Sequence, residues 1–306
     1  MKRVHVVSAG DSYMYRLAIA LKNKGYDVSC SGVKYDSPEA QELLQSDVLL
    51  EELSYFTVSS RPRIDYVVPS LQVTAEHPEI KKAREQGLLV VAFPDFILRM
   101  AKDKIRVVIS DVRYPTRILS SMIYRAVVRQ NMRCDYVVMN EMKGLEKRIV
   151  LSYDARIILL EGDETDTYMF EKKPTHHLYR PHILLLPDVK WHASETFPTL
   201  ESYKNLLKEM VASIERDGKF IYNQNIPFLQ ELADSVREDI TAIPYSSHKI
   251  MENAGQVCLD TRYGLIPVCH SDEDFLSDLN AARLASRQLG VNDKDFYQLV
   301  SEFVNE

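Results

Sequence analysis

Short apolar runs alternate with helical patterns along most of this chain, and this alternation constrains the fold more than any other feature. Residues 4–7 form an apolar run, and residues 13–24 follow it with apolar side chains at helical spacing. Gly25 then stands where a helix C-cap glycine belongs. Strands that alternate with helices form a mostly parallel sheet with helices on its faces, so we expect an α/β protein.

The pattern continues in two series, and we place the boundary between them at residues 100–103. Each series predicts one α/β domain, the first over residues 1–102 and the second over residues 103–306. The expected strands are residues 26–30, 66–68, 88–93, 105–109, 136–139, 157–161, 182–186, 219–222 and 240–243, with a hairpin of 256–260 and 265–269. The expected helices are residues 78–86, 117–129, 203–216, 228–236, 273–289 and 293–304, with Asp293 as the N-cap of the last.

Composition and charge exclude several classes of function. A chain of 306 residues is too long for one ordinary hydrophobic core, which favours two domains. The net charge of −6 opposes a nucleic-acid partner, and no apolar run approaches the roughly 18 residues that cross a membrane. The cysteines, which form no C-x-x-C pair, favour buried free thiols and a cytoplasmic location. They are Cys30, Cys134, Cys258 and Cys269.

An ordered set of segments resembles the Mur ligase family. The acidic segment 161–164 directly follows a predicted strand and resembles the acidic motif of these enzymes. The segment 177–186 resembles the stretch that follows this motif in the murein-peptide ligases. These form one branch of the family with the UDP-N-acetylmuramate–alanine ligases. Further similar segments, in the same order as in the family, are residues 25–29, 77–80, 191–193, 197–199, 218–223 and 290–297. The resemblance therefore covers nearly the whole chain.

The resemblance implies three domains and an ATP-driven reaction. In the family the first domain holds the UDP part of UDP-N-acetylmuramate, the central domain holds ATP and Mg²⁺, and the third closes over the site. The muramoyl carboxylate becomes an acyl phosphate, which an amine then attacks. By this resemblance residues 1–102 correspond to the first domain, which is Rossmann-like, and residues 103–306 to the central ATPase domain, a P-loop-like α/β domain. Because the chain stops at Glu306, we expect the C-terminal domain to be absent.

The segment of this chain that corresponds to the family's nucleotide loop departs most from the family's pattern. The family has Gly-Thr/Ser-His-Gly-Lys-Thr-Thr, whereas this chain has no glycine or lysine in the segment and places Pro115 or Thr116 at the lysine position. Arg113 and Arg117 still flank a predicted helix start, so one hypothesis is that this segment binds a lone anion. The other hypothesis is an ordinary strand–turn–helix link. The loop equivalents are Ser110, Asp111, Arg113, Pro115, Thr116 and Arg117.

The metal motif is altered as well. Glu164 matches the acidic residue that binds magnesium in the family, and Asp163 accompanies it. The family's histidine falls on Ala193, while His192 takes the place of its aspartate. A transition-metal site of Asp163, Glu164 and His192, joined by a neighbouring histidine at 176 or 177, is the alternative to a solvated acidic turn. We favour the solvated turn and expect no metal and no cofactor.

The residues that contact the adenine base and the sugar nucleotide in the family are also different in this chain. The family's His-Asn at the adenine falls on Asp274 and Phe275. Family glycines of the first-domain loop fall on Ser8 and Asp11, and we expect Asp11 to oppose a pyrophosphate at the following helix start. The sugar-nucleotide loop equivalents are Ser8, Gly10, Asp11 and Ser12.

These joint changes support two hypotheses. The first is a Mur-ligase-like protein without catalytic residues, which binds a small molecule in an interdomain cleft or a protein partner such as a full-length Mur ligase, in peptidoglycan metabolism. The second is an active ATP-dependent ligase or phosphohydrolase with a remodelled site of Arg113, Arg117, Glu164 and His192. The residues that are vestigial under the first hypothesis are Asp163, Glu164 and His192.

Overall fold

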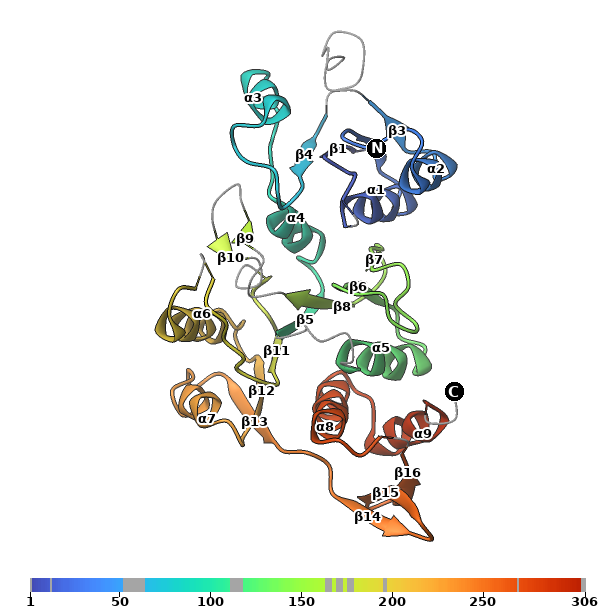
Figure 1. Ribbon diagram of the computed structural model, residues 1–306, viewed down its shortest axis with the longest axis vertical. Helices are drawn as coiled ribbons and strands as arrows, with labels where there is room; N and C mark the ends of the chain where they lie inside the picture. The colour runs from blue at the N-terminus through green and yellow to red at the C-terminus, as the bar shows by residue number, and fades with distance from the viewer. Residues whose placement is uncertain are drawn as a thin grey trace.

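The computed structural model contains two parallel sheets stacked along the long axis of the molecule, with a small antiparallel sheet beyond them (Figure 1). The smaller parallel sheet is N-terminal, and the larger one comes after it in sequence. The structure describes residues 2–11, 13–51, 64–110, 118–162, 167–168, 173–174, 179–194, 197–268 and 270–303.

The N-terminal sheet has four parallel strands in the order β3-β2-β1-β4. The strand order reverses between β1 and β4, as in Rossmann-like sheets, which confirms the expected fold class. Helix α1 buries the apolar stripe that its spacing predicts, and Gly25 follows it with φ +92°, as expected of a residue that ends a helix. The elements are β1 (Arg3–Val7), α1 (Met14–Asn23), β2 (Asp27–Cys30), α2 (Pro38–Gln45), β3 (Leu49–Leu50), β4 (Tyr66–Pro69), α3 (Pro78–Glu85) and α4 (Phe93–Met100).

The central sheet has seven strands in the order β13-β12-β11-β5-β8-β6-β7, and all its pairs are parallel except β6 with β7. Its middle strands are continuous apolar runs because both faces are covered. The strands are β5 (Ile105–Ser110), β6 (Cys134–Val137), β7 (Ile149–Val150), β8 (Ile157–Gly162), β11 (Ile183–Leu186), β12 (Lys219–Asn223) and β13 (Thr241–Tyr245). The helices are α5 (Leu119–Arg129), α6 (Leu200–Ala212), α7 (Pro227–Asp234), α8 (Glu273–Gln288) and α9 (Asp293–Phe303).

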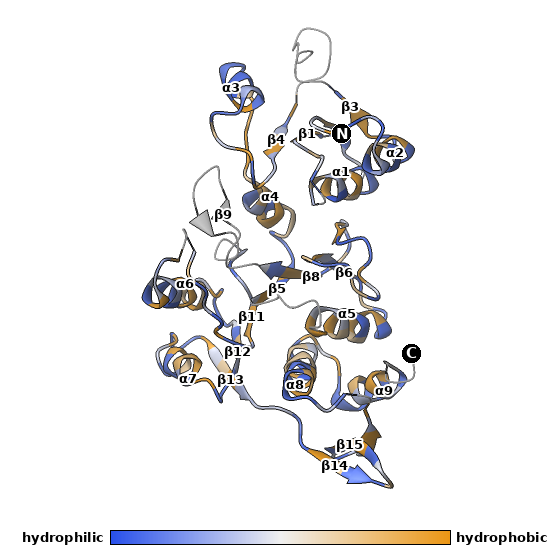
Figure 2. Ribbon diagram, viewed as in Figure 1, coloured by the Kyte–Doolittle hydropathy of each residue, from blue (hydrophilic) through white to orange (hydrophobic). Residues whose placement is uncertain are grey.

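Two short antiparallel groups complete the described elements. The expected hairpin is confirmed as β15 (Gln256–Thr261) and β16 (Gly264–Pro267), and β14 (Ile250–Asn253) adds a third strand to it. A second pair joins β9 (Thr167–Tyr168) to β10 (Lys173–Pro174). The helices around the sheets carry both hydrophobic and hydrophilic stretches, as amphipathic helices do (Figure 2). None of the helices in the described ranges is long and apolar enough to span a membrane.

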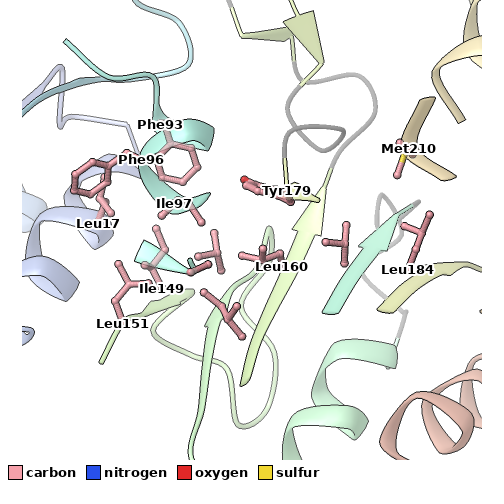
Figure 3. Close-up of a cluster of buried hydrophobic side chains, with 14 of the residues drawn as sticks. Leu17, Phe93, Phe96, Ile97, Ile149, Leu151, Leu160, Tyr179, Leu184 and Met210 are labelled. Atoms are coloured by element: carbon pink, nitrogen blue, oxygen red, sulfur yellow. The ribbon is translucent and has the colours of Figure 1, made fainter. Parts of the chain in front are cut away.

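The N-terminal unit and the central sheet share one apolar core (Figure 3). Leu17 of α1 and Phe96 and Ile97 of α4 belong to the same buried cluster as Leu160 of β8 and Leu184 of β11. All five side chains are fully buried, and each contributes about 1.5–3 kcal/mol by leaving water. The first sheet is therefore fixed to one face of the second by packing, while α5, α8 and α9 cover the other face.

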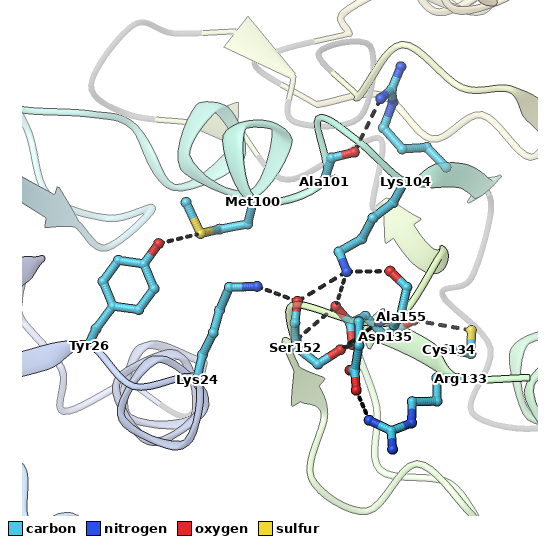
Figure 4. Close-up of polar contacts among 12 residues, drawn as sticks. Lys24, Tyr26, Met100, Ala101, Lys104, Arg133, Cys134, Asp135, Ser152 and Ala155 are labelled. Atoms are coloured by element: carbon cyan, nitrogen blue, oxygen red, sulfur yellow. Dashed lines mark hydrogen bonds and ion pairs between the residues drawn. The ribbon is translucent and has the colours of Figure 1, made fainter. Parts of the chain in front are cut away.

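A buried polar cluster joins the same two units beside this core (Figure 4). The Lys104 ammonium lies 3.0 Å from a carboxylate oxygen of Asp135 and donates to the carbonyls of Ala155 at 2.6 Å and Ser152 at 3.1 Å. Lys24, at the end of α1, donates to the same Ser152 carbonyl. Burial, together with the nearby Lys104 ammonium, lowers the pKa of Lys24. Because each ammonium finds carbonyl or carboxylate oxygen, this cluster holds α1 against the central unit.

Some expected elements differ in the structure. Residues 88–93 are not a strand, because only Val90 forms a bridge, to Val67, and Pro94 opens α4 directly afterwards. Helix α9 begins at Asp293 itself, and its cap is Asn292, whose Oδ1 accepts from the Asp295 amide at 2.9 Å. Helix α2 and strand β3 were not expected. The division into domains at residues 102 and 103 stays a prediction.

Candidate functional site

A pocket of about 450 Å³ opens at the carboxyl ends of the N-terminal strands. It lies where the strand order reverses between β1 and β4, which is the position where open α/β sheets bind ligands. Its walls come from the loops after β1, β2 and β4 and from the start of α2. The lining residues are Ser8, Gly10, Asp11, Gly32, Lys34, Ser37, Glu39, Ser70 and Gln72.

The loops after β1 and β2 touch backbone to backbone at one side of this pocket. A Cβ atom added to Gly10 would lie 2.5 Å from the Gly32 carbonyl oxygen, and one added to Gly32 would lie 2.8 Å from the Ser8 Cα. Gly32 also has φ +71°. Only glycine allows this approach, so the two glycines fix the shape of the pocket floor.

Ser8 keeps the backbone of a glycine-rich loop while carrying a side chain. Its φ is +58°, in the left-handed region, at a position where the resemblance placed a family glycine. The neighbouring Ala9 amide donates to the Ser31 carbonyl at 2.8 Å, which ties this loop to the one after β2. Ser8 therefore holds a left-handed backbone conformation that favours glycine, at a cost of about 1 kcal/mol in backbone strain.

Asp11 occupies the start of α1 with its own carboxylate. Its Oδ1 accepts hydrogen bonds from the Tyr13 amide at 2.8 Å and from the Met14 amide at 2.7 Å. These amides belong to the first turn of α1, where the helix dipole favours negative charge. The structure thus modifies our expectation of repulsion between Asp11 and a bound pyrophosphate, because the Asp11 carboxylate already takes the place of an anion. Ser12 lies outside the described residues.

The start of α2 forms the opposite wall and is also capped from within the chain. Ser37 Oγ accepts from the Ala40 amide at 3.2 Å. Hydrogen bonds from its own backbone amide and from Ser37 hold the pKa of Glu39 below its usual range. The ionisable lining residues are therefore two acids, Asp11 and Glu39, and one base, Lys34.

A buried polar group supports the pocket from below. Ser31 Oγ donates to Glu79 Oε2 at 2.6 Å, and the other Glu79 oxygen lies 3.6 Å from His5 Nε2. His5 Nδ1 lies 2.9 Å from Ser29 Oγ. His5 and Glu79 are almost fully buried, so this group stabilises strands β1 and β2 where their loops begin.

A second carboxylate, Glu161, lies at the corresponding edge of the central sheet. It is the penultimate residue of β8, paired with Ile109 of β5, and it accepts from Ser120 Oγ at the start of α5 and from the Met139 amide at 2.7 Å. It is only 5% exposed, and this burial raises its pKa to about 7. The sequence reasoning included Glu161 in the acidic motif but gave it no role. Its position directly after an apolar strand was the available signal.

The side chain of Tyr13, directly before α1, reaches this second edge. Tyr13 donates its hydroxyl to Met139 Sδ at 3.3 Å, and the Arg148 guanidinium lies 4.7 Å from the Tyr13 ring centroid. Arg148 also donates to the Met139 carbonyl, and Phe93 packs edge-on against Tyr13 at 5.5 Å. The first turn of α1 therefore bridges the carboxyl edges of the two sheets, through the same Met139 whose amide binds Glu161.

The other predicted site residues are only partly described. Ser110 is buried at the end of β5, His192 is exposed after β11, and Asp274 is exposed in the first turn of α8. Phe275 is buried, with its amide bound to the Asp272 carboxylate at 2.9 Å. No three His, Cys, Asp or Glu side chains within the described ranges could hold a metal ion. The residues that lie outside those ranges are Asp111, Arg113, Pro115, Thr116, Arg117, Asp163, Glu164, His176 and His177.

Comparison with known proteins identifies the fold. The crystal structure of the UDP-N-acetylmuramate:L-alanyl-gamma-D-glutamyl-meso-diaminopimelate ligase from Neisseria meningitides superposes with a TM-score of 0.80 at 17% identity, over 98% of both chains. A murein peptide ligase from Psychrobacter arcticus gives 0.77 at 17% identity, over 98% of this chain and 68% of that one. The chain therefore has the fold of the Mur ligases.

The sequence relatives include two kinds of Mur ligase. The ligase for L-alanyl-gamma-D-glutamyl-meso-2,6-diaminoheptandioate from Escherichia coli is 20% identical over 318 residues, covering 99% of this chain and 68% of that protein. The Haemophilus influenzae counterpart is 20% identical over 71% of this chain and 48% of its own length. A UDP-N-acetylmuramate–L-alanine ligase from Psychrobacter is 24% identical over 57% of this chain and 36% of that protein.

The first of these relatives are longer than the aligned region. The chain spans about half or less of the Haemophilus and Psychrobacter proteins that it matches. No family model matches the chain. The chain is thus similar to the murein-peptide and alanine ligases. At this level of sequence identity, the similarity shows the fold alone.

Proposed function

We propose that this chain uses the Mur ligase fold to bind a small molecule without ATP-driven ligation, in the cytoplasm and in connection with peptidoglycan metabolism. The structural observation that carries the change of ligand is the Asp11 carboxylate on the first amides of α1, while the absence of ATP-driven ligation rests on the nucleotide loop. The relatives are named for a UDP-sugar substrate, and a diphosphate needs such amides and a favourable field. In this chain those amides are already bound and the pocket contains two acids.

The nucleotide loop supports the same proposal from sequence. Phosphoryl transfer requires backbone amides around the phosphates and a lysine on the β- and γ-oxygens. Residues 110–117 contain no glycine and no lysine, and Pro115 has no amide hydrogen to donate. This segment therefore lacks the glycines and the lysine that the family uses to hold ATP.

The described edge of the central sheet does not suit Mg²⁺ either. A metal ion needs a carboxylate with free lone pairs and further oxygen ligands at octahedral positions. Glu161 has both oxygens hydrogen-bonded, to Ser120 and to the Met139 amide, and burial favours its neutral form. A metal ion would have to share these oxygens with the two donors and would require the buried carboxyl group to ionise.

Calorimetric titration with ATP and Mg²⁺ tests this proposal. We expect no binding up to millimolar ATP, and a dissociation constant near the micromolar range would contradict the proposal. A parallel assay measures phosphate release with UDP-N-acetylmuramate and L-alanine present. Release that is lost in Glu164→Ala but kept in Glu209→Ala, a matched change on α6, would establish the remodelled ligase or phosphohydrolase instead.

A further inference from the structure

We infer that the N-terminal pocket takes an uncharged ligand rich in hydroxyl groups, such as a sugar or a nucleoside without phosphate, and that Asp11 is the residue that excludes phosphate. This inference deepens the proposed function and rests on it, since it names the class of small molecule that the fold binds. The pocket, its walls and the contacts of Asp11 are the observations that support it.

The first step concerns the anion position at α1. A bound phosphate would use the free amides at the start of a helix of ten residues. Two of these amides, from Tyr13 and Met14, are held by Asp11 Oδ1 at 2.8 and 2.7 Å. A phosphate would have to displace the carboxylate and then remain beside it, with both groups negatively charged.

The second step concerns the rest of the wall. The start of α2 offers no replacement position, because Ser37 caps it and Glu39 carries a negative charge there. Lys34 supplies one positive charge against two acids. A diphosphate would therefore meet a pocket whose ionisable side chains have a net charge of −1, which does not offset its own negative charge.

The third step concerns the groups that the lining offers instead. Among the described residues, all hydrogen bonds to the Asp11 side chain fall on Oδ1, which leaves Oδ2 to accept from a ligand. Ser70 Oγ accepts from the Gln72 amide at 3.3 Å, and a hydroxyl group can donate as well as accept. A ligand hydroxyl group both donates and accepts hydrogen bonds. The lining offers partners for both, namely carboxylate acceptors, a hydroxyl, an amide side chain and one ammonium.

The volume agrees with this class of ligand. A pocket of about 450 Å³ falls within the range of small-molecule sites and holds a sugar or a nucleoside. Gly10 and Gly32 bring the loops after β1 and β2 into close backbone contact at its floor, so neither position leaves room for a side chain.

The test compares uridine with UDP, which differ only by the diphosphate, by ligand-observed NMR and calorimetry on the full chain. For the wild type we expect UDP to bind no more tightly than uridine, and we expect binding of uridine or of N-acetylglucosamine. For Asp11→Gly, which frees the Tyr13 and Met14 amides, we expect UDP to gain at least about tenfold over uridine. Asp11→Asn keeps an acceptor without the charge, so its gain should be smaller.

Glu39→Gln is the matched control, because it removes one charge from the same pocket and leaves the α1 amides occupied. Its gain for UDP should also be smaller than that of Asp11→Gly. A wild type that prefers UDP tenfold, an unchanged preference in both Asp11 variants, or a wild type that binds neither neutral probe would overturn the inference. ATP binding in the calorimetric titration would refute the proposed function and leave these results interpretable, since they concern the first sheet alone.

Discussion

Asp11 and Glu161 place a carboxylate at the carboxyl edge of each parallel sheet, and each accepts two hydrogen bonds from the chain. Their surroundings differ. Asp11 is partly exposed and lines an open pocket, whereas Glu161 is 5% exposed between the start of α5 and the loop after β6. In the exposed position, by the inference above, the carboxylate selects among ligands. In the buried position the same arrangement mainly affects stability, because unpaired polar groups are costly only where water is excluded.

The largest expected effect is that of Glu161→Ala on stability. The change leaves the Ser120 hydroxyl and the Met139 amide without their acceptor in a buried site and opens a cavity there. We expect a loss of about 4 kcal/mol in the free energy of unfolding, measured by urea denaturation at pH 5. A loss no greater than that of Asp11→Ala would show that burial does not separate the two carboxylates.

The second prediction concerns pH. The pKa of Glu161 is raised from its ordinary value of 4.5 to about 7 in the folded state, so the folded protein binds this proton more tightly than the unfolded chain. The stability that the group contributes is full below pH 4.5 and is lost as pH rises through 7. The loss is on the order of 3 kcal/mol, and urea denaturation from pH 4.5 to 8.5 measures it.

Glu161→Gln is the control for this pH dependence. A glutamine keeps the carbonyl acceptor for the Met139 amide and offers a donor to Ser120, as a protonated glutamate does. The variant should match the wild type near pH 5 and exceed its stability near pH 8. An equal decline in both proteins would assign the pH dependence to other groups.

The third prediction is the smaller cost of Asp11→Ala. Loss of a side chain that caps the start of a helix destabilises by about 1 kcal/mol, because water replaces the carboxylate at exposed amides. Asp11→Asn should lose only part of this, since it keeps an acceptor. Urea denaturation measures both, and a cost of 3 kcal/mol or more would mean that Asp11 is as deeply integrated as Glu161.

The main course of the fold followed from apolar periodicity. The run at residues 4–7, the helical spacing after it and Gly25 predicted β1, α1 and the turn to β2. Helix α2 was not predicted because only Ala40 and Leu43 are buried on it, although Ser37 and Pro38 are a helix start signal. The run 88–93 is as apolar as a strand, but whether it pairs depends on a distant neighbour, and only Val90 does.

The candidate site was predicted less completely because its contacts are not local. Glu161 is held by groups 41 and 22 residues away, which no sequence window contains. The contact between Gly10 and Gly32 depends on how two loops meet. Asp11 did carry a local signal, an acid shortly before a helix, but we interpreted it only as a contact to a ligand. The family resemblance located this loop, and the structure defined its chemistry.

The smallest predicted effect is that of Ser8→Gly, and it tests why the first loop differs from a glycine-rich one. Ser8 has φ +58°, so glycine should relieve strain and raise the free energy of unfolding by about 0.5–1 kcal/mol. Gly25→Ala provides the matched opposite, because Gly25 has φ +92° with no atom within 4 Å of an added Cβ. The expected loss of about 1 kcal/mol in the free energy of unfolding of Gly25→Ala measures the conformational cost alone. If Ser8→Gly instead destabilises the protein, the Ser8 side chain makes a contact that outweighs this cost, and the first loop would then be held by side chains as the Glu161 site is.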